Sequence, residues 1–419
     1  MNIRPFLKLW FQAWLQRLPK SIKLRFWKQI KPLLPKEPTQ HLDDAFDPLH
    51  TLLWLSEKDP FRWVDAMAGT AIWGGNGGGK TSGPGQALLR AFMRGGAGGL
   101  ILCVKPDEYE MVRSYAEKEG RLGSLIRFAP EEKWRFNFMA YLLKSMVRGG
   151  GRSANIVKTF VAIQDSLDRG DDAGAKQEKY WKNVLSQLLL SAVDLCLLAN
   201  PEESLSVQMI HEVITSAPVS RAQALDHEWQ DTSLCCRLID RAYLNDALTP
   251  RQKSGLALTA KFFTKEFPGL PDDTRGSAVS TFTTMADGFL RGDMAELFST
   301  GLNVVPEMTL EGAIWVLDLP LKLFGQVGLA AQILVKHIWQ EAVERRDVKA
   351  NPRPVFIWAD EGQNFVNEHD VQFQTTARSS RACTVYLSQT LNNFCNSSGG
   401  RKGRLQKPRR IFTLDLALY

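Results

Sequence analysis

The chain has 419 residues, of which 44% are hydrophobic and 23% are charged. This composition is typical of globular proteins and excludes an intrinsically disordered chain, and the length suits about two domains. The net charge is +7, but residues 1–36 carry nine Lys or Arg and no acid, and residues 401–419 carry six basic residues against one acid. These ends leave a net charge of −7 on residues 37–400. The total charge therefore does not by itself indicate that the body of the chain binds nucleic acid.

Residues 1–36 form a basic arm that is predicted to contain an amphipathic helix with Pro19 as its stop. The apolar residues of this helix share one face: Ile3, Phe6, Leu7, Trp10, Trp14 and Leu18. Docking within the same fold, contact with nucleic acid or a partner, and contact with an anionic membrane surface all suit such a helix. The residues leave these alternatives open.

Transmembrane and secretory segments are not expected. The most apolar stretch, Val184 to Ala199, contains Asp194 and is shorter than the roughly 20 residues that a membrane-spanning helix needs. The basic first segment lacks the separate apolar core of a signal peptide. The six cysteines show no CxxC pair and the six histidines show no ligand spacing. We expect a cytoplasmic protein with free thiols and without a metal site built from protein side chains alone.

After a proline-marked linker at residues 32–38, residues 37–138 alternate buried strands with amphipathic helices. Strands are predicted at Thr70–Trp73, Gly99–Val104 and Leu125–Phe128. Helical spacing follows the first strand, at Leu88, Leu89, Phe92 and Met93. This alternation is typical of an α/β domain with a parallel sheet, of which residues 37–138 are predicted to be the first half.

A complete G-x-x-x-x-G-K-T phosphate loop begins at Gly74 and lies between the first of these strands and its helix. Gly77 and Gly79 keep side chains away from the concave anion site that consecutive backbone N–H groups form. Lys80 is expected to reach the β- and γ-phosphates, and the Thr81 hydroxyl is expected to hold Mg²⁺. The strand, loop and helix context distinguishes this motif from a flexible glycine-rich turn, so it predicts nucleotide binding.

Strand signals fade over residues 139–300, which we predict to be an all-α insertion domain. Its helical periodicity is illustrated by Leu185, Leu188, Leu189 and Val193. Apolar strands then return at Ala313–Leu317, Val355–Ala359 and Thr384–Leu387, with a helix predicted over Val327–Glu344. Residues 301–419 are therefore expected to resume the sheet as its second half.

The strand over Val355–Ala359 ends in Asp360 and Glu361, the Walker B pattern. Asp360 is expected to hold Mg²⁺ through water, and Glu361 is expected to polarise or deprotonate the water that attacks the γ-phosphate. An apolar strand followed by two acids is also a common solvated turn. Its pairing with a phosphate loop in one chain favours hydrolysis over binding alone.

The next strand ends at Ser388-Gln389-Thr390, which places Gln389 where it can sense the γ-phosphate. Arg378 and Arg381 lie just before that strand. A solvated basic surface explains them equally well. The sharper hypothesis is that one of them enters the nucleotide site of a neighbouring subunit as an arginine finger.

Several separated motifs resemble those of the type IV secretion coupling proteins, the TraG/TraD-like conjugative ATPases related to FtsK and HerA motors. The resemblance covers about residues 65–395. Its motifs agree in order and spacing and lie at residues 79–86 (GKTSGPGQ), 136–137 (FN), 280–288 (STFTTMADG), 316–320 (VLDLP), 360–365 (DEGQNF) and 373–378 (FQTTAR).

This resemblance implies a RecA-like P-loop domain interrupted by an all-α domain, with ATP and Mg²⁺ as ligands. It also implies a homo-hexamer that transfers single-stranded DNA, or a relaxase–DNA complex, to components of a type IV secretion channel. By motif matching, Lys80 and Thr81 take the phosphate-loop roles, Asp360 and Glu361 the Walker B roles, Arg378 that of the finger, and Gln389 that of the sensor.

Two departures from the family pattern leave alternatives open. Members usually carry N-terminal transmembrane helices, whereas this chain has its basic arm, which puts attachment to the inner membrane in question and leaves peripheral contact through residues 1–36 as an alternative. Residues 396–410 form a Gly, Ser, Lys and Arg tract, which is expected to mark a truncated or altered tail and leaves a final sheet strand in question. The alternative function is a truncated nucleotide-binding docking module that recruits partner proteins without translocating DNA.

Overall fold

The computed structural model of the chain describes residues 46–75, 77–144, 152–167, 175–199, 205–390 and 410–413. The predictions for the basic arm, residues 1–36, lie outside these ranges. Arg135–Leu302 forms one compact unit, the helical unit, and the described residues before and after it form the other, the sheet unit. Over the described ranges, no helix combines the length and the apolar character needed to cross a membrane.

In the described residues, the large sheet of the sheet unit has seven strands in the order β5-β6-β4-β7-β8-β3-β9, and every neighbouring pair in it is parallel. The strands are β3 (Thr70–Trp73), β4 (Gly98–Leu102), β5 (Leu125–Phe128), β6 (Ile314–Leu317), β7 (Val355–Ala359), β8 (Ala382–Ser388) and β9 (Arg410–Thr413). Every residue of β4, β6, β7 and β8 is buried, because helices cover both faces of a parallel sheet. The predicted α/β fold class with a mainly parallel sheet is confirmed.

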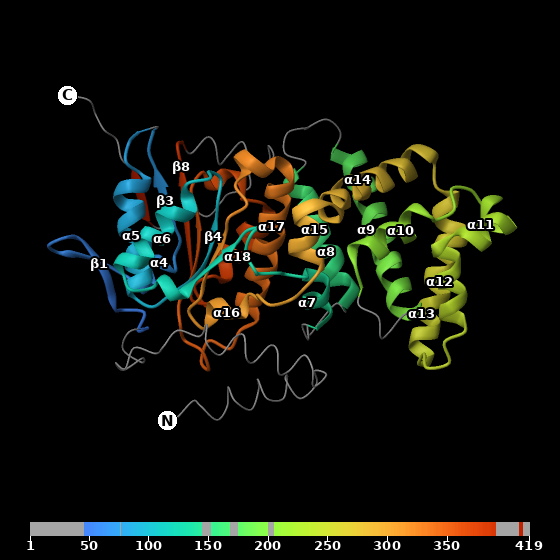
Figure 1. The fold of residues 1–419 in the computed structure, drawn as a ribbon, viewed down its shortest axis with the longest axis horizontal. Helices are drawn as coiled ribbons and strands as arrows, with labels where there is room; N and C mark the ends of the chain where they lie inside the picture. The colour runs from blue at the N-terminus through green and yellow to red at the C-terminus, as the bar shows by residue number, and fades with distance from the viewer. Residues whose placement is uncertain are drawn as a thin grey trace. The chain divides into compact units, whose positions relative to one another are not determined.

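The direction of each crossover decides which face its helix covers. Helices α5 (Gln86–Arg94) and α6 (Glu108–Lys118) lie in crossovers that run toward the β5 edge of the sheet. Helices α17 (Leu321–Arg345) and α18 (Glu368–Thr376) lie in crossovers that run toward the β9 edge. Since parallel crossovers are right-handed, opposite steps place their helices on opposite faces. Figure 1 shows this arrangement, with α5 and α6 on one side of β3, β8 and β4 and with α17 and α18 on the other.

The edge strand β9 answers the question of a final sheet strand, which the sequence of the tail left open. It pairs in parallel with β3, and Arg410 lies opposite Thr70 while Thr413 lies opposite Trp73. The sequence left a missing final strand as an open question because the tract before Ile411 has no strand pattern of its own. The structure places a strand there, so β3 has a hydrogen-bonded neighbour on both sides.

The sequence analysis did not predict two features of the sheet unit, a hairpin and a short helix, and it placed the start of a third, helix α17, too late. An antiparallel hairpin, β1 (Thr51–Ser56) and β2 (Asp59–Arg62), precedes the short helix α4 (Trp63–Ala66). The short helix α16 (Glu307–Leu310) precedes β6. Helix α17 begins at Leu321, before the predicted start at Val327, and Gly325 interrupts it with φ 54 and ψ −136. This left-handed backbone suits glycine, which explains why regular helical periodicity starts only after it.

The helical unit consists of helices over its described residues, with α9 in contact with α8, α10, α12, α13 and α14. The helices are α7 (Phe138–Lys144), α8 (Arg152–Leu167), α9 (Ala175–Ala199), α10 (Val207–Thr215), α11 (His227–Thr232), α12 (Leu234–Tyr243), α13 (Pro250–Lys261), α14 (Asp272–Leu290) and α15 (Gly292–Ser299). The predicted apolar positions Leu185, Leu188, Leu189 and Val193 are buried on α9. The all-α character of the insertion is therefore confirmed.

The segments that enter and leave the helical unit pair with each other. Phe136 and Leu302 form an isolated antiparallel bridge, and Asn137 N donates to Gly301 O at 2.6 Å. The Asn137 side chain donates to Ser299 O at 3.0 Å and accepts from Ala140 N at the start of α7. Phe136-Asn137 thus closes the base of the insertion, which lies in the chain between the neighbouring strands β5 and β6.

Gly98 at the start of β4 has no room for a side chain. A Cβ at this position would lie 1.8 Å from Thr309 O on α16. Gly98→Ala is therefore expected to lower the free energy of unfolding by about 3 kcal/mol, because backbone must move to admit a methyl group. Urea denaturation measures this change. Gly123→Ala, where no atom lies within 4 Å, is the control and should stay within about 0.5 kcal/mol of wild type. Equal effects of the two substitutions would contradict the close packing of α16 on β4.

Candidate nucleotide-binding site

The phosphate loop leaves the carboxyl end of β3 as a turn that requires glycine. Gly74 N donates to Ser388 O at 3.2 Å, which ties the start of the loop to the end of β8. Gly77 and Gly79 have φ values of 73° and 75°. Side chains are strongly disfavoured at these angles, so the motif's glycines are explained by backbone conformation as well as by access to phosphates.

A π-helical turn, η1 (Thr81–Gly85), joins the loop to α5. Gly85 N donates to Lys80 O at 2.9 Å, and a Cβ at Gly85 would lie 2.7 Å from that carbonyl and 3.0 Å from a Leu387 methyl group. This glycine therefore lets the start of the helix pack closely on β8. The N-terminus of this helix, with the positive end of the helix dipole, favours an anion in the loop.

The two acids after β7 lie beside the phosphate loop. Thr81 Oγ1 donates to Asp360 Oδ2 at 3.0 Å, and Lys80 Nζ lies 3.5 Å from Glu361 Oε1. The side chains of Lys80 and Glu361 are 9% and 12% exposed, so this ion pair is largely shielded from water. The structure thus brings together the lysine and the carboxylates that the sequence predicted to share one ligand, although they are far apart in the chain.

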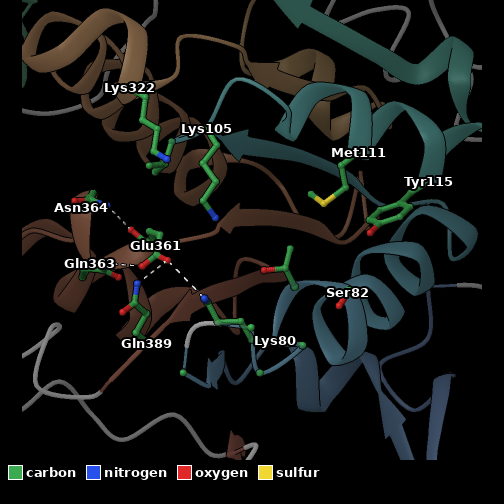
Figure 2. Close-up of a pocket in the computed structure, with 16 residues that line it drawn as sticks. Lys80, Ser82, Lys105, Met111, Tyr115, Lys322, Glu361, Gln363, Asn364 and Gln389 are labelled. Carbon is green, nitrogen blue, oxygen red and sulfur yellow. Dashed lines mark hydrogen bonds and ion pairs between the residues drawn. The ribbon is translucent and has the colours of Figure 1, made fainter.

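The order of the strands explains this meeting, because β8 lies between β3 and β7. Gln389, just past the end of β8, donates from Nε2 to Glu361 Oε1 at 3.3 Å. Gln363 donates to Glu361 Oε2 at 2.9 Å and accepts from Ser388 Oγ at 2.7 Å. Figure 2 shows Lys80, Gln363 and Gln389 converging on the Glu361 carboxylate. The predicted sensor and general base are therefore in direct contact.

Lys105 belongs to this cluster, and the sequence analysis did not identify it. It follows β4, the other neighbour of β7, and its Nζ lies 3.1 Å from Asp360 Oδ2. Burial by itself would lower the pKa of Lys105, but the Asp360 carboxylate outweighs burial and raises it above its usual value. A lysine directly after a buried strand was the available signal, but its meaning depends on which strands are neighbours.

A pocket of about 650 Å³ opens over the phosphate loop. This volume lies within the range of sites for small ligands and cofactors, about 300–1,000 Å³. Figure 2 shows the loop and Glu361 on one side of the pocket and α6, with Met111 and Tyr115, on the other. The lining also includes Ser82, Val104, Lys105, Lys322, Gln363, Asn364 and Gln389. The pocket therefore combines an anion cradle, one acidic group, Glu361, and a partly apolar wall.

The two arginines proposed as fingers lie before β8, away from its carboxyl end and from the residues that line the pocket. Arg381 donates from Nη1 to Phe46 O and to Pro352 O, both at 2.8 Å, so its guanidinium binds backbone of its own chain. Arg378 is exposed. Of the two, Arg378 is the one that the structure leaves available to a neighbouring subunit.

Glu108 supports the turn that carries Lys105. This first residue of α6 is 6% exposed and accepts a hydrogen bond from Val104 N at 2.6 Å. Its other oxygen has no hydrogen-bond partner among the described residues. Burial raises the pKa of Glu108 from 4.5 to about 8, although the Val104 hydrogen bond acts in the opposite direction. The carboxyl group is therefore largely protonated in the folded chain at neutral pH.

This raised pKa predicts a pH-dependent effect of Glu108→Gln. Between about pH 4.5 and pH 8 the folded chain holds a proton that the unfolded chain has lost, so this group's contribution to stability falls as pH rises. The free energy of unfolding of the variant minus that of wild type should therefore increase as pH rises from 5 to 9, by on the order of 3 kcal/mol. Urea denaturation at both pH values measures it. Glu110→Gln, an exposed carboxylate on α6, is the matched control, and an equal gain there would refute the assignment to Glu108.

Comparison with known proteins supports the fold. No family model matches the sequence, and no curated protein sequence matches it. Among solved structures, the trigonal form of the bacterial conjugative coupling protein TrwBdeltaN70 in complex with sulphate is similar, with TM-score 0.56 and 12% identity over 92% of this chain and 76% of that chain.

Two nucleotide complexes of the plasmid coupling protein TrwB are similar to the same extent. The complex with ADP and Mg²⁺ has TM-score 0.54 and 12% identity, and the complex with a non-hydrolysable ATP analogue has TM-score 0.54 and 11% identity. Each match covers 92% of this chain and 76% of that chain. Similarity at this low identity establishes the fold, as the sequence motifs predicted: the chain shares the RecA-like P-loop fold of the conjugative coupling proteins.

Proposed function

We propose that this chain is an ATP-hydrolysing motor of the coupling-protein type. The observation that carries the proposal is the contact of Lys80 with Glu361 beside the contact of Thr81 with Asp360. Lys80, Thr81 and Glu361 line one pocket. A phosphate-binding lysine and a carboxylate able to activate water thereby face the same space, which the transfer of a phosphoryl group to water requires.

The site also fits Mg²⁺. Thr81 and Asp360 offer a hydroxyl and a carboxylate oxygen that lie 3.0 Å apart, and oxygen is the ligand that Mg²⁺ prefers. Asp360 would hold the ion through water, and Thr81 would hold it directly. Bound Mg²⁺ supplies neutralisation of the charge that develops on the β- and γ-phosphates.

The remaining side chains take roles in ATP hydrolysis. The backbone from Gly74 to Gly79 cradles the phosphates, and Lys80 binds the β- and γ-phosphate oxygens. A triphosphate then replaces Glu361 as the partner of Lys80. This exchange frees the Glu361 carboxylate to accept a proton from the attacking water. Gln389, which already contacts Glu361, is placed to sense the γ-phosphate.

The comparisons support the cellular role that we propose. TrwB is described as a conjugative coupling protein and has been solved with ADP and Mg²⁺. By analogy, this chain would drive single-stranded DNA or a relaxase–DNA complex toward a type IV secretion channel, as a homo-hexamer. Contacts of a ring motor with DNA are mainly to the phosphate backbone, so DNA binding should weaken strongly with salt.

ATP turnover with and without single-stranded DNA at fixed salt tests this function. The wild-type chain should hydrolyse ATP, and DNA should raise kcat. Lys80→Ala should abolish turnover by removing the phosphate contact. Glu361→Gln should lower kcat by about 10²–10⁴-fold while ATP still binds, because it removes only the general base. The measurement is phosphate release, with nucleotide binding followed in parallel.

Lys118→Ala, at the exposed end of α6, is the control and should leave turnover unchanged. Turnover without stimulation by DNA would contradict the motor but not the hydrolase. Nucleotide binding without turnover would contradict the hydrolase and favour a docking module.

Arg378 is proposed to complete the site of a neighbouring subunit. Arg378→Ala should lower kcat by about 10³-fold with little change in ATP affinity, because the guanidinium stabilises charge in the transition state. A mixture of Arg378→Ala and Glu361→Gln chains should regain turnover, since mixed assemblies contain some sites with both groups intact. Absence of complementation in assemblies shown to be mixed, or unaltered turnover by Arg378→Ala alone, would exclude this residue.

A further inference from the structure

A buried ion pair adjoins the loop that follows Glu361. Lys336 on α17 and Asp370 on α18 form this pair, and their side chains are 0% and 2% exposed. Lys336 Nζ also donates to Phe365 O at 2.6 Å, which is a carbonyl of the loop itself. One buried ammonium therefore joins helix α17, helix α18 and the loop over residues 362–367.

The Asp370 carboxylate makes three further hydrogen bonds. Its Oδ2 accepts from Asn367 N at 2.8 Å, and its Oδ1 accepts from Gln340 Nε2 at 2.8 Å and from Tyr386 OH at 3.0 Å. We call the four side chains Lys336, Gln340, Asp370 and Tyr386 the clasp. The clasp connects the loop to α17, α18 and β8 at once.

Stability alone does not account for the clasp. Burial by itself would raise the pKa of Asp370, but the Lys336 ammonium and the hydrogen bonds outweigh burial and lower it, so the carboxylate stays charged. Taking two charges out of water carries a large free-energy cost, and a protein with apolar residues of similar volume in their place is often equally stable or more so. What a buried ion pair adds over apolar packing is a defined geometry for the groups around it.

The geometry that needs support is that of Glu361. Its backbone is left-handed, with φ 50, a conformation that is unfavourable outside glycine and persists only when its surroundings enforce it. Asn364 donates to Glu361 O from both its backbone N, at 3.0 Å, and its side chain, at 2.9 Å. A Cβ at Gly362 would lie 2.8 Å from Tyr386 Cβ, so this loop packs directly on a clasp residue.

We propose that the clasp positions the general base: by anchoring residues 362–367, it fixes the left-handed backbone of Glu361 and thereby aims its carboxylate at the phosphate loop. This inference rests on the proposed hydrolytic function. The four clasp residues are positioning residues, since none of them lines the pocket. They act on the reaction only through the loop and Glu361.

Tyr386→Phe is the main test, because it removes one hydrogen bond with little change of shape. It should lower kcat about tenfold, leave ATP affinity within about twofold, and speed amide hydrogen exchange over residues 362–367 about tenfold, since small misplacement of a reacting group costs rate rather than binding. Lys336→Met combined with Asp370→Asn removes both charges and should cause a larger loss with the same pattern.

Thr309→Val is the matched control. Thr309 on α16 accepts a buried hydrogen bond at 2.9 Å from Trp339, which lies on α17 like Lys336 and Gln340. Neither Thr309 nor Trp339 belongs to the clasp. This variant should keep the kcat and the loop exchange of wild type, although it too loses a buried hydrogen bond.

Three results would overturn or reassign the inference. Wild-type loop exchange and kcat in both clasp variants would overturn it. A parallel loss of kcat, ATP affinity and exchange protection throughout the sheet unit would also overturn it, because that pattern indicates a merely structural role. If the wild-type chain itself has no ATP turnover, the proposed function fails, and the exchange comparison alone then decides whether the clasp fixes the loop.

Discussion

The ion pair between Lys80 and Glu361 is the contact on which the proposed site depends. It forms across β8, since the lysine follows β3 and the glutamate follows β7. The side chains of Lys80 and Glu361 are only 9% and 12% exposed, so each charge has lost most of its contact with water and needs other polar partners. Gln363 and Gln389 supply them to Glu361, and a bound triphosphate would supply them to Lys80. The resting contact thus holds both groups where the proposed reaction needs them.

The parallel sheet makes this arrangement possible, because the carboxyl ends of all its strands meet at one edge. Strands β4, β7, β8 and β3 are consecutive in the sheet, and each delivers part of the cluster to that edge. The helical unit interrupts the chain between β5 and β6, at the end of the sheet away from β3. A large insertion at this point leaves the strands that carry the phosphate loop, the acids and the sensor in register.

Two sets of largely buried polar contacts hold the same short segment, Glu361 and the loop that follows it. Lys80, Gln363 and Gln389 contact the Glu361 carboxylate. The clasp anchors the loop that follows Glu361. Between them, a residue with an unfavourable left-handed conformation is constrained at both its side chain and its main chain. A single hydrogen bond at the surface could not impose such a geometry, because water would compete for it.

Elements that depend on a local pattern of residues could be predicted before the fold was known. The strand Thr70–Trp73 and the strand Val355–Ala359 were predicted with the bounds that the structure has, because continuous apolar runs and turn residues define buried strands. The glycines of the phosphate loop and the paired acids were likewise readable, since their chemistry lies in consecutive residues. The roles assigned to these residues remain predictions for experiment.

The order of the strands could not be predicted in this way, because pairing of parallel strands is set by crossovers and packing rather than by residues within a strand. That order brings Lys105 to Asp360 and places β9 beside β3, and neither contact has a local signature. The clasp is similarly hidden in the sequence. Lys336, Asp370 and Tyr386 lie on three separate elements, and an isolated polar residue within a helix or strand pattern normally indicates a solvated surface.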